Sequence, residues 1–127
     1  MGMFKKKVKV TNSKESSFWF ESEFWVDTGA LYSFIPENLA KKIHFEPISS
    51  RNVFFADGKT SKCLFGTLNF EIEGFEESIP CPVVICAKNS PLLLGATTLE
   101  NFAVEVDPAH KKLIPIQTLI WSFIATR

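Results

Sequence analysis

The stretch that most constrains the fold is residues 24–30 (FWVDTGA), where an apolar run ends abruptly in an acid and a tight turn. The first three residues are large and favour a buried strand. Asp27 follows at once, and its charge is costly to bury without a partner. A small residue and Gly29 come next, so the backbone turns sharply or approaches another segment closely. An acid at the end of a buried strand, on such a turn, is placed for chemistry.

The length of 127 residues is enough for one domain with a sizeable core and short for two, so we expect residues 1–127 to form a single domain. Basic and acidic residues number 14 each, so the formal net charge is zero and gives no general attraction to nucleic acid or to an anionic membrane. The most apolar segment, residues 113–124, is shorter than the ~18 residues that a membrane-spanning helix needs. We therefore expect no nucleic-acid partner and no membrane partner.

The three cysteines, Cys63, Cys81 and Cys86, cannot all pair with one another within one chain. Their spacing matches no zinc site, so we expect neither a metal nor a cofactor. The beginning of the chain carries no signal-peptide pattern. A cytoplasmic location is therefore expected, with the cysteines as buried or half-buried free thiols.

The periodic stretches are dominated by β-branched and aromatic residues, which favours strands. Alternation predicts a hairpin of strands over residues 4–11 and 17–26, and then a short strand over residues 31–35. Asp57-Gly58 lies between two further strand-like runs and predicts a hairpin whose tight turn needs positive φ at both positions. The later strands are predicted over residues 66–72, 78–85, 91–95, 103–107 and 112–116.

Three of these later strands have distinct expected environments. Pro80 and Pro82 restrict residues 78–85 to a sheet edge or an irregular position, since proline cannot donate to a ladder. Residues 91–95 (PLLLG) form a strand buried on both faces, and residues 112–116 form a last core strand. Short helices are expected over residues 36–43, with Pro36 in the first turn, and over residues 96–102, with Thr97 or Thr98 as the cap and Leu99 and Phe102 turned inward.

The order of these parts resembles the retropepsin-like aspartic proteases, single-lobe enzymes typified by retroviral protease. The residues that carry the resemblance are the DTGA motif at 27–30, the hairpin at Asp57-Gly58 and the LLG motif at 93–95. It covers roughly residues 3–116 and leaves an apolar extension over residues 117–127. The resemblance implies a mostly β, closed barrel-like lobe that acts as a two-fold symmetric homodimer.

The activity implied by the resemblance is that of an aspartic endopeptidase with Asp27 as the catalytic carboxylate. The sequence holds one such motif, so each subunit would own half a site and the mechanism requires the homodimer. Two copies of Asp27 about 3 Å apart hold one proton between them. One carboxylate then activates a water molecule and the other protonates the scissile carbonyl of an extended peptide or protein substrate.

Other residues gain roles through the same resemblance. Thr28 bonds across the dimer axis, and Leu94 and Gly95 pass behind the active-site loop and support it together with Gly29. A flap over residues 55–60 closes on a peptide that binds as an added strand. The extension over residues 117–127 is expected at the dimer interface. The implied substrate-binding residues are Gly29, Ala30, Leu31, Phe55, Ala56, Asp57 and Gly58.

The chain departs from the family pattern in two places. Leu31 and Ala96 stand where viral members carry an Asp and an Arg that pair, and the flap tip over residues 56–59 is polar where viral tips are glycine-rich. These departures keep a second hypothesis open, a catalytically silent peptide-binding or dimerisation module of the same fold. Asp27 would then be a turn aspartate that caps local amides. A metal or redox protein that uses the cysteines is a third.

Overall fold

The computed structural model describes residues 3–87 and 90–116, and within these ranges the chain forms nine strands and two short helices. The extension over residues 117–127, and its expected place at a dimer interface, lies outside the described residues. The elements are β1 (Lys5–Asn12), β2 (Trp19–Val26), β3 (Ser33–Pro36), α1 (Glu37–Lys42), β4 (Ser49–Phe54), β5 (Thr60–Ile72), β6 (Ile79–Cys86), β7 (Leu93–Leu94), α2 (Ala96–Asn101), β8 (Val104–Asp107) and β9 (Lys112–Pro115).

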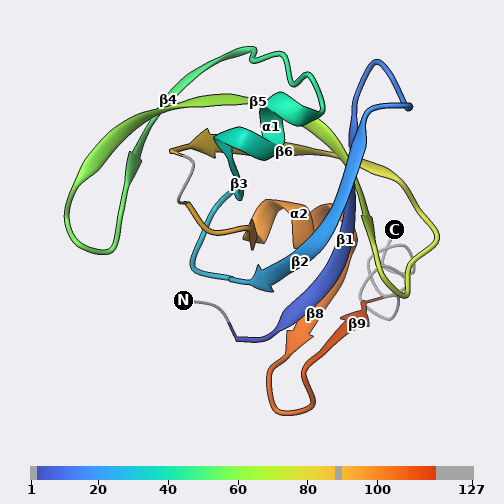
Figure 1. Cartoon of the computed structure of the whole chain (residues 1–127). Coiled ribbons are helices and arrows are strands. Elements are labelled where there is room, and N and C mark those ends of the chain that lie inside the picture. The colour runs from blue at the N-terminus through green and yellow to red at the C-terminus, as the bar shows by residue number, and fades with distance from the viewer. Residues whose placement is uncertain (1–2, 88–89, 117–127) are drawn as a thin grey trace, which may run out of the picture.

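A single sheet dominates the molecule and closes on itself (Figure 1). In the described part of the chain its order is β1-β2-β7-β3-β6-β5-β4, and β1 pairs again with β5. Six strands therefore form a closed barrel. β4 is not one of them: it pairs only with β5, and the two strands form an arm that extends from the barrel. The expectation of a mostly β, closed barrel with two short helices is confirmed.

The core fills the inside of this barrel. Alternation along β1, β2 and β5 turns every second side chain inward, and Val8, Val10, Phe24 and Phe70 are completely buried. The rings of Phe24 and Phe70 meet edge to face with centroids 5.9 Å apart. Helix α2 packs against β6 and also contacts β3 and β8.

The hairpin of β1 and β2 has the predicted position and pairs from Lys5 opposite Trp25 to Thr11 opposite Trp19. The short strand β7 is also confirmed. It pairs in parallel with β2 and antiparallel with β3, and Leu94 is completely buried. The apolar run before Gly95 therefore lies in the middle of the sheet.

The prediction of an edge or irregular position for residues 78–85 is confirmed for the half of the strand that holds the prolines and is wrong for the other half. β6 lies between β5 and β3, but β3 pairs only with residues 83–86 of it. Pro80 and Pro82 pair with β5 alone, opposite Asn69 and Thr67. The prolines thus occupy the part of β6 that β3 does not reach, where a missing N–H costs no ladder bond on that side.

The turn at the tip of the β4–β5 hairpin also differs from the prediction. Gly58 has a φ of +84°, whereas Asp57 keeps a negative φ. Gly58 donates its N–H to Phe55 O, and Phe55 donates to Lys59 O. The loop is therefore a three-residue connection with a glycine in the left-handed position, the next commonest way to close a hairpin.

Two predictions near the end of the described chain are wrong. β9 pairs with β8 in a separate two-stranded sheet and is mostly exposed, so it is no core strand. Gly95 is the N-cap of α2, and none of the described side chains makes a capping bond there. Thr98 is instead completely buried, while Leu99 and Phe102 turn inward as expected.

The cysteines depart from the expectation of free thiols. Cys63 in β5 and Cys86 in β6 form a disulfide, with Cα atoms 5.0 Å apart, whereas Cys81 is buried and free within the described chain. Leu64 pairs with Ile85, so the next positions along the two strands face each other. Spacing in the sequence could not reveal this register.

In residues 3–87 and 90–116, no helix combines the length and the apolar character that crossing a membrane requires.

Candidate active site

Asp27 stands directly after β2, where this strand runs beside β7. Trp25 donates its N–H to Leu92 O at 2.9 Å, and Asp27 donates its own to Leu94 O at 3.0 Å. Val26 is completely buried and Asp27 is half-buried. The two motifs singled out in the sequence are therefore neighbours, and the second holds the backbone of the acid from one side.

The loop after β2 orients the carboxylate with its own amides. Gly29 donates its N–H to Asp27 Oδ1 at 3.0 Å, and Ala30 donates to Asp27 O at 3.2 Å. A Cβ on Gly29 would lie 3.2 Å from Asp27 Oδ1, which is a tight contact. Thr28 and Gly29 are exposed. A turn aspartate makes the same bond to a local amide, so this contact fits both hypotheses for Asp27.

The first residues of α2 hold the other side of the loop. Ala96 donates its N–H to Ala30 O at 2.7 Å, and Thr97 donates to Leu31 O at 3.0 Å. The first amides of a helix have no partner within the helix, so here they serve a neighbouring segment. A Cβ on Gly95 would lie 2.3 Å from Tyr32 O, so this close approach of two backbones requires glycine.

Main-chain hydrogen bonds bring positions 31 and 96, which carry no charge, close to each other. The Leu31 side chain is 63% exposed, and its carbonyl accepts the bond from Thr97. Ala96 bonds to the residue just before Leu31. Backbone hydrogen bonds thus connect these segments without an ion pair between positions 31 and 96.

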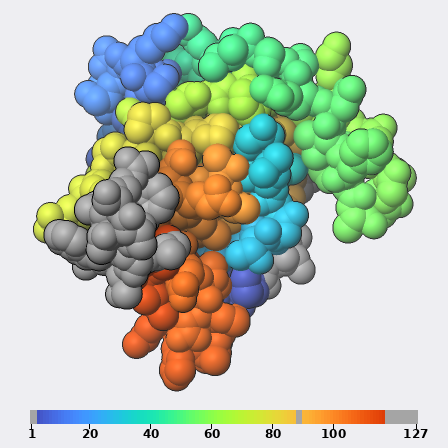
Figure 2. Space-filling model, turned by 180° about the vertical axis from the view of Figure 1, so that it is seen from behind, coloured from blue at the N-terminus to red at the C-terminus, as the bar shows by residue number. Residues whose placement is uncertain are grey.

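The predicted flap is the tip of the arm formed by β4 and β5, which stands out from the rest of the molecule (Figure 1, Figure 2). The ring of Phe55 is half-buried and meets Phe34 in β3 edge to face, with centroids 6.4 Å apart. Asp57 Oδ1 accepts the N–H of Lys59 at 2.9 Å, which fixes the tip locally. The three tip residues Ala56, Asp57 and Gly58 are exposed.

A small apolar cluster lies at the base of this arm. It is built around the disulfide and Val84, all buried. Tyr32, Phe34, Val53, Phe55 and Phe65 are the half-buried side chains that pack against it. The cluster connects the flap to β3, the strand that follows the Asp27 loop.

The predicted site residues therefore fall into two groups. The structure brings one group together around the loop after β2, and Phe55 links the second group on the arm to β3 through Phe34. The first group consists of Asp27, Thr28, Gly29, Ala30, Leu31, Leu94 and Gly95. The second consists of Phe55, Ala56, Asp57 and Gly58.

Sequence reasoning missed two polar side chains behind the loop. Ser33 and Thr98 are both completely buried, and their hydroxyl oxygens lie 2.6 Å apart. Ser33 Oγ also accepts the N–H of Gly95 at 3.1 Å. The available signal was a serine inside an otherwise apolar strand, because a buried hydroxyl needs a partner.

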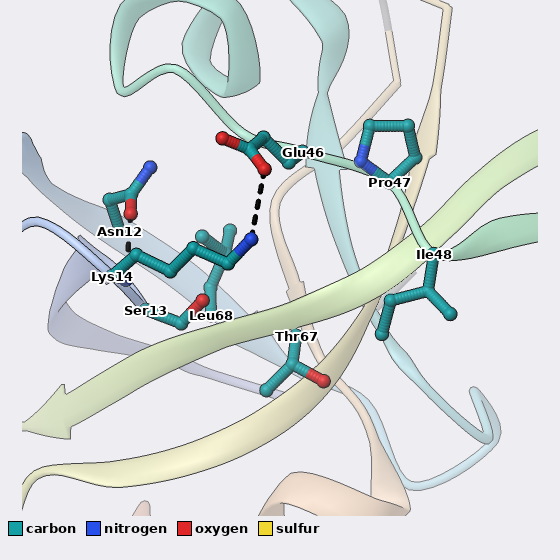
Figure 3. A pocket seen from close by; sticks show the side chains of 8 residues that line it. All are labelled: Asn12, Ser13, Lys14, Glu46, Pro47, Ile48, Thr67 and Leu68. Carbon is teal, nitrogen blue, oxygen red and sulfur yellow. Dashed lines mark hydrogen bonds and ion pairs between the residues drawn. The ribbon is translucent and has the colours of Figure 1, made fainter.

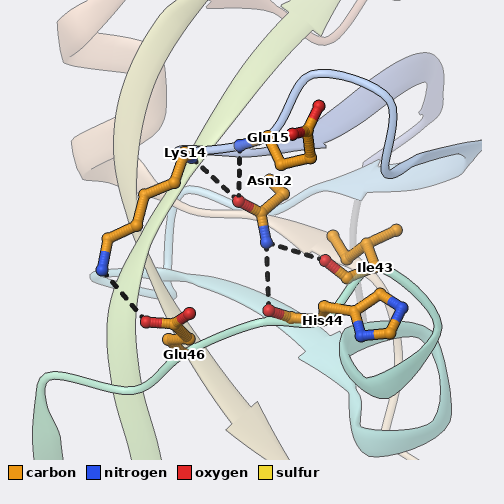
Figure 4. A network of polar contacts seen from close by, with 6 residues as sticks. All are labelled: Asn12, Lys14, Glu15, Ile43, His44 and Glu46. Atoms are coloured by element: carbon orange, nitrogen blue, oxygen red, sulfur yellow. Dashed lines mark hydrogen bonds and ion pairs between the residues drawn. The ribbon is translucent and has the colours of Figure 1, made fainter.

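A cavity of about 160 Å³ lies elsewhere, and no predicted site residue lines it (Figure 3). Asn12 at its wall donates its side-chain amide to Ile43 O and His44 O, and its Oδ1 accepts two backbone N–H groups (Figure 4). Lys14 pairs with Glu46 at 3.0 Å. These polar groups bond to one another and connect β1 to the end of α1. Their hydrogen bonds are therefore satisfied without a ligand. The lining residues are Asn12, Ser13, Lys14, Glu46, Pro47, Ile48, Thr67 and Leu68.

The remaining cysteine and the acidic and histidine side chains form no further centre. Burial raises the pKa of the Cys81 thiol, and hydrogen bonds from Asn101 and Thr98 offset part of that rise. Among the side chains of residues 3–87 and 90–116, no three His, Cys, Asp or Glu gather as metal ligands would.

Comparisons with known proteins bear on the fold. No family model matches the chain, and no curated protein matches its sequence. Among solved structures, the chain is similar to EIAV protease complexed with the inhibitor HBY-793, with a TM-score of 0.63 and 12% sequence identity. The match covers 82% of this chain and 91% of that one. The chain therefore has a fold like that of a retroviral aspartic protease lobe.

Proposed function

We propose that this chain is a homodimeric aspartic endopeptidase that hydrolyses peptide bonds in extended polypeptide segments. The observation that carries the proposal is the bond from Asp27 N–H to Leu94 O, at 3.0 Å. It joins an acid at a strand end to a buried apolar strand behind it, inside a barrel with a retropepsin-like fold. Such a loop gives a carboxylate a fixed direction, which catalysis by positioned groups requires.

The reaction requires two copies of Asp27. Because the chain has one DTG motif, the second carboxylate comes from a partner subunit. With the two side chains within hydrogen-bonding distance, the pair holds one proton. The water molecule attacks the scissile carbonyl carbon while the ionised carboxylate takes a proton from it. The protonated carboxyl group donates its proton to the carbonyl oxygen. Thr28 and Leu31, exposed on the same loop, are available to the partner or the substrate.

The substrate would be held between the Asp27 loop and the arm. Gly29, Ala30 and Leu31 would line one side, and residues 55–58 would close from the other. An extended peptide that pairs with these segments as an added strand is presented with its backbone accessible to the carboxylates. Closure of the arm would exclude bulk water from the reaction.

We place the protein in the cytoplasm, as the sequence suggested. Disulfides are rare in that reducing compartment, so Cys63 and Cys86 would be a dithiol there. Counting the free thiols of protein isolated from cells under alkylating conditions tests the location. Three free thiols support the cytoplasm, and one argues for an oxidising compartment.

A second candidate is a silent peptide-binding module of the same fold. The exchange of a charge pair for Leu31 and Ala96 favours it, since the exposed Leu31 side chain gives the loop an apolar contact surface. Such a protein would bind extended peptides in the same place without turnover.

The test compares cleavage of an unfolded protein by the wild type, Asp27→Asn and Asp107→Asn from about pH 3 to about pH 8. Asparagine keeps an oxygen for the Gly29 amide but cannot act as acid or base, so Asp27→Asn should abolish cleavage. Asp107, which bonds His110 on the β8–β9 hairpin, is a carboxylate outside the site, and its variant should cleave normally. Retained cleavage by Asp27→Asn would refute the proposal. Peptide binding without cleavage by the wild type would favour the silent module.

A further inference from the structure

We infer that the buried hydroxyl pair of Ser33 and Thr98 positions the loop that carries Asp27. The inference rests on the proposed function for its catalytic meaning. Ser33 lies in β3 and Thr98 in α2, and both side chains are 0% exposed. Their oxygens lie 2.6 Å apart, the shortest of the side-chain hydrogen bonds in the described chain.

The connection to Asp27 is short. Gly95 donates its N–H to Ser33 Oγ at 3.1 Å. The residue before Gly95 is Leu94, whose carbonyl accepts the N–H of Asp27 at 3.0 Å. A displacement of Gly95 therefore moves the acceptor that holds the backbone of the acid.

The hydroxyls form an ordered series of hydrogen bonds. Ser33 Oγ accepts from Gly95 and can donate its own hydrogen to Thr98 Oγ1. The neighbouring Cys81 thiol donates to Ile79 O at 3.4 Å and accepts from Asn101 Nδ2 at 3.8 Å. Each of the two buried hydroxyl oxygens therefore has a hydrogen-bond partner.

The geometry at Gly95 explains why hydroxyls are used at this place. A Cβ on Gly95 would lie 2.3 Å from Tyr32 O, so no side chain of its own can fix the distance between β3 and α2. Two apolar side chains could fill the same volume, but they would leave the Gly95 N–H without an acceptor. The hydroxyl pair supplies that acceptor, and it keeps the first amides of α2 in reach of Ala30 O and Leu31 O.

Thr98 offers a matched pair of variants. Thr98→Val keeps the shape and loses the hydroxyl, whereas Thr98→Ser keeps the hydroxyl and loses a methyl group. If the hydroxyl positions the loop, Val should be the more harmful change there, and Ser should behave as the wild type. If Thr98 only fills space, the order is reversed, because Ser leaves a small void. Ser33→Ala removes the acceptor itself and should exceed both, and the Thr98 pair decides the question should Ser33→Ala not fold.

The first readout is amide hydrogen exchange measured by NMR. In Thr98→Val the amides of Gly95 and Asp27 should exchange about fivefold faster than in the wild type, the factor expected for one weakened hydrogen bond. Amides of β1 serve as the reference, since general destabilisation would speed them equally. Equal acceleration in β1, or wild-type exchange at Gly95 and Asp27, would overturn the inference.

The second readout is the split between kcat and KM in cleavage. A displaced acid slows the chemical step, so Thr98→Val should lower kcat by about tenfold and leave KM within about twofold. Wild-type kcat in Thr98→Val beside a lower kcat in Thr98→Ser would contradict the inference and leave the proposed protease intact. If the wild type itself does not cleave, the proposed function fails, and the exchange measurement alone decides whether the hydroxyl pair positions the loop.

Discussion

At the scale of single residues, Gly95 shows how closely the site is packed. A Cβ there would lie 2.3 Å from Tyr32 O and 2.9 Å from Ala30 O, and both neighbours are main chain. Backbone cannot rotate away as a flexible side chain can. The loop after β2 can follow this path only because the N-cap residue of α2 has no side chain.

Gly95→Ala should lower the free energy of unfolding by about 3 kcal/mol, the upper part of the range for overpacking. Gly74→Ala is the control, because a Cβ there meets nothing within 4 Å and the φ of +95° alone costs about 1 kcal/mol. Urea denaturation of both variants measures the difference. Equal losses in the two variants would show that the close approach at Gly95 is not tight.

Cys81 gives a pH-dependent prediction. Its pKa is raised in the folded protein because burial disfavours the thiolate, so the folded state binds the proton more tightly than the unfolded state. The resulting stability is present below the ordinary thiol pKa of about 8.5 and is lost as the pH rises beyond it.

Cys81→Ser should therefore show a smaller fall in unfolding free energy between about pH 7.5 and about pH 9.5 than the wild type. Serine keeps a hydroxyl for Asn101 and Thr98 but does not ionise in this range. Denaturant titrations at the two pH values, on both proteins, give the slopes. Equal slopes would mean that Cys81 does not contribute to the pH dependence.

The contact between the buried residues Ser33 and Thr98 could not be predicted from the sequence. Thr97 or Thr98 is the expected helix cap from the sequence, because threonine favours that position and both lie near the helix start. Gly95 takes the cap, and Thr98 lies one turn inside against Ser33. A contact between residues 65 positions apart depends on the packing of β3 on α2, which local pattern does not contain.

At the scale of elements, the sequence correctly predicted the hairpins and the short buried strand, because local sequence patterns determine them. The β1–β2 hairpin, the hairpin tipped by Asp57-Gly58 and the buried β7 follow from alternation, turn residues and apolar runs. The exact turn type was wrong, since two geometries suit the same dipeptide. The environments predicted for one half of β6 and for β9 were also wrong, because neither proline content nor apolar content says how far a neighbouring strand extends.

The disulfide joins the arm to the barrel. Cys63 lies one position beyond the last β5–β6 pair, and Cys86 ends β6. Relative to the oxidised protein, replacing both by alanine should lower the free energy of unfolding by about 3 kcal/mol, as expected for a loop whose ends are 23 residues apart. A dithiol reductant should destabilise the wild type similarly and leave the double variant unchanged. Insensitivity of the wild type to the reductant would show that the pair is not bonded in solution.

At the scale of the whole molecule, closure of the sheet is the step that the sequence did not specify. β1 pairs with β5 from Val8 opposite Ile72 to Asn12 opposite Leu68, across a long stretch of chain. Only the resemblance to a known family predicted this closure, together with the neighbourhood of residues 27–30 and 93–95. The proposed second subunit belongs to the same scale, because one chain supplies a single acid and the proposed mechanism uses two.

The proposal depends above all on two subunits sharing one active site. It is tested most directly by mixing wild-type and Asp27→Asn subunits in equal amounts and letting them exchange before the cleavage assay. If each active site takes one Asp27 from each subunit, random pairing leaves about one quarter of the dimers with both acids. The account therefore predicts about one quarter of the activity of the same total amount of wild type. Activity of about one half would mean that each subunit acts alone, and would contradict the shared site.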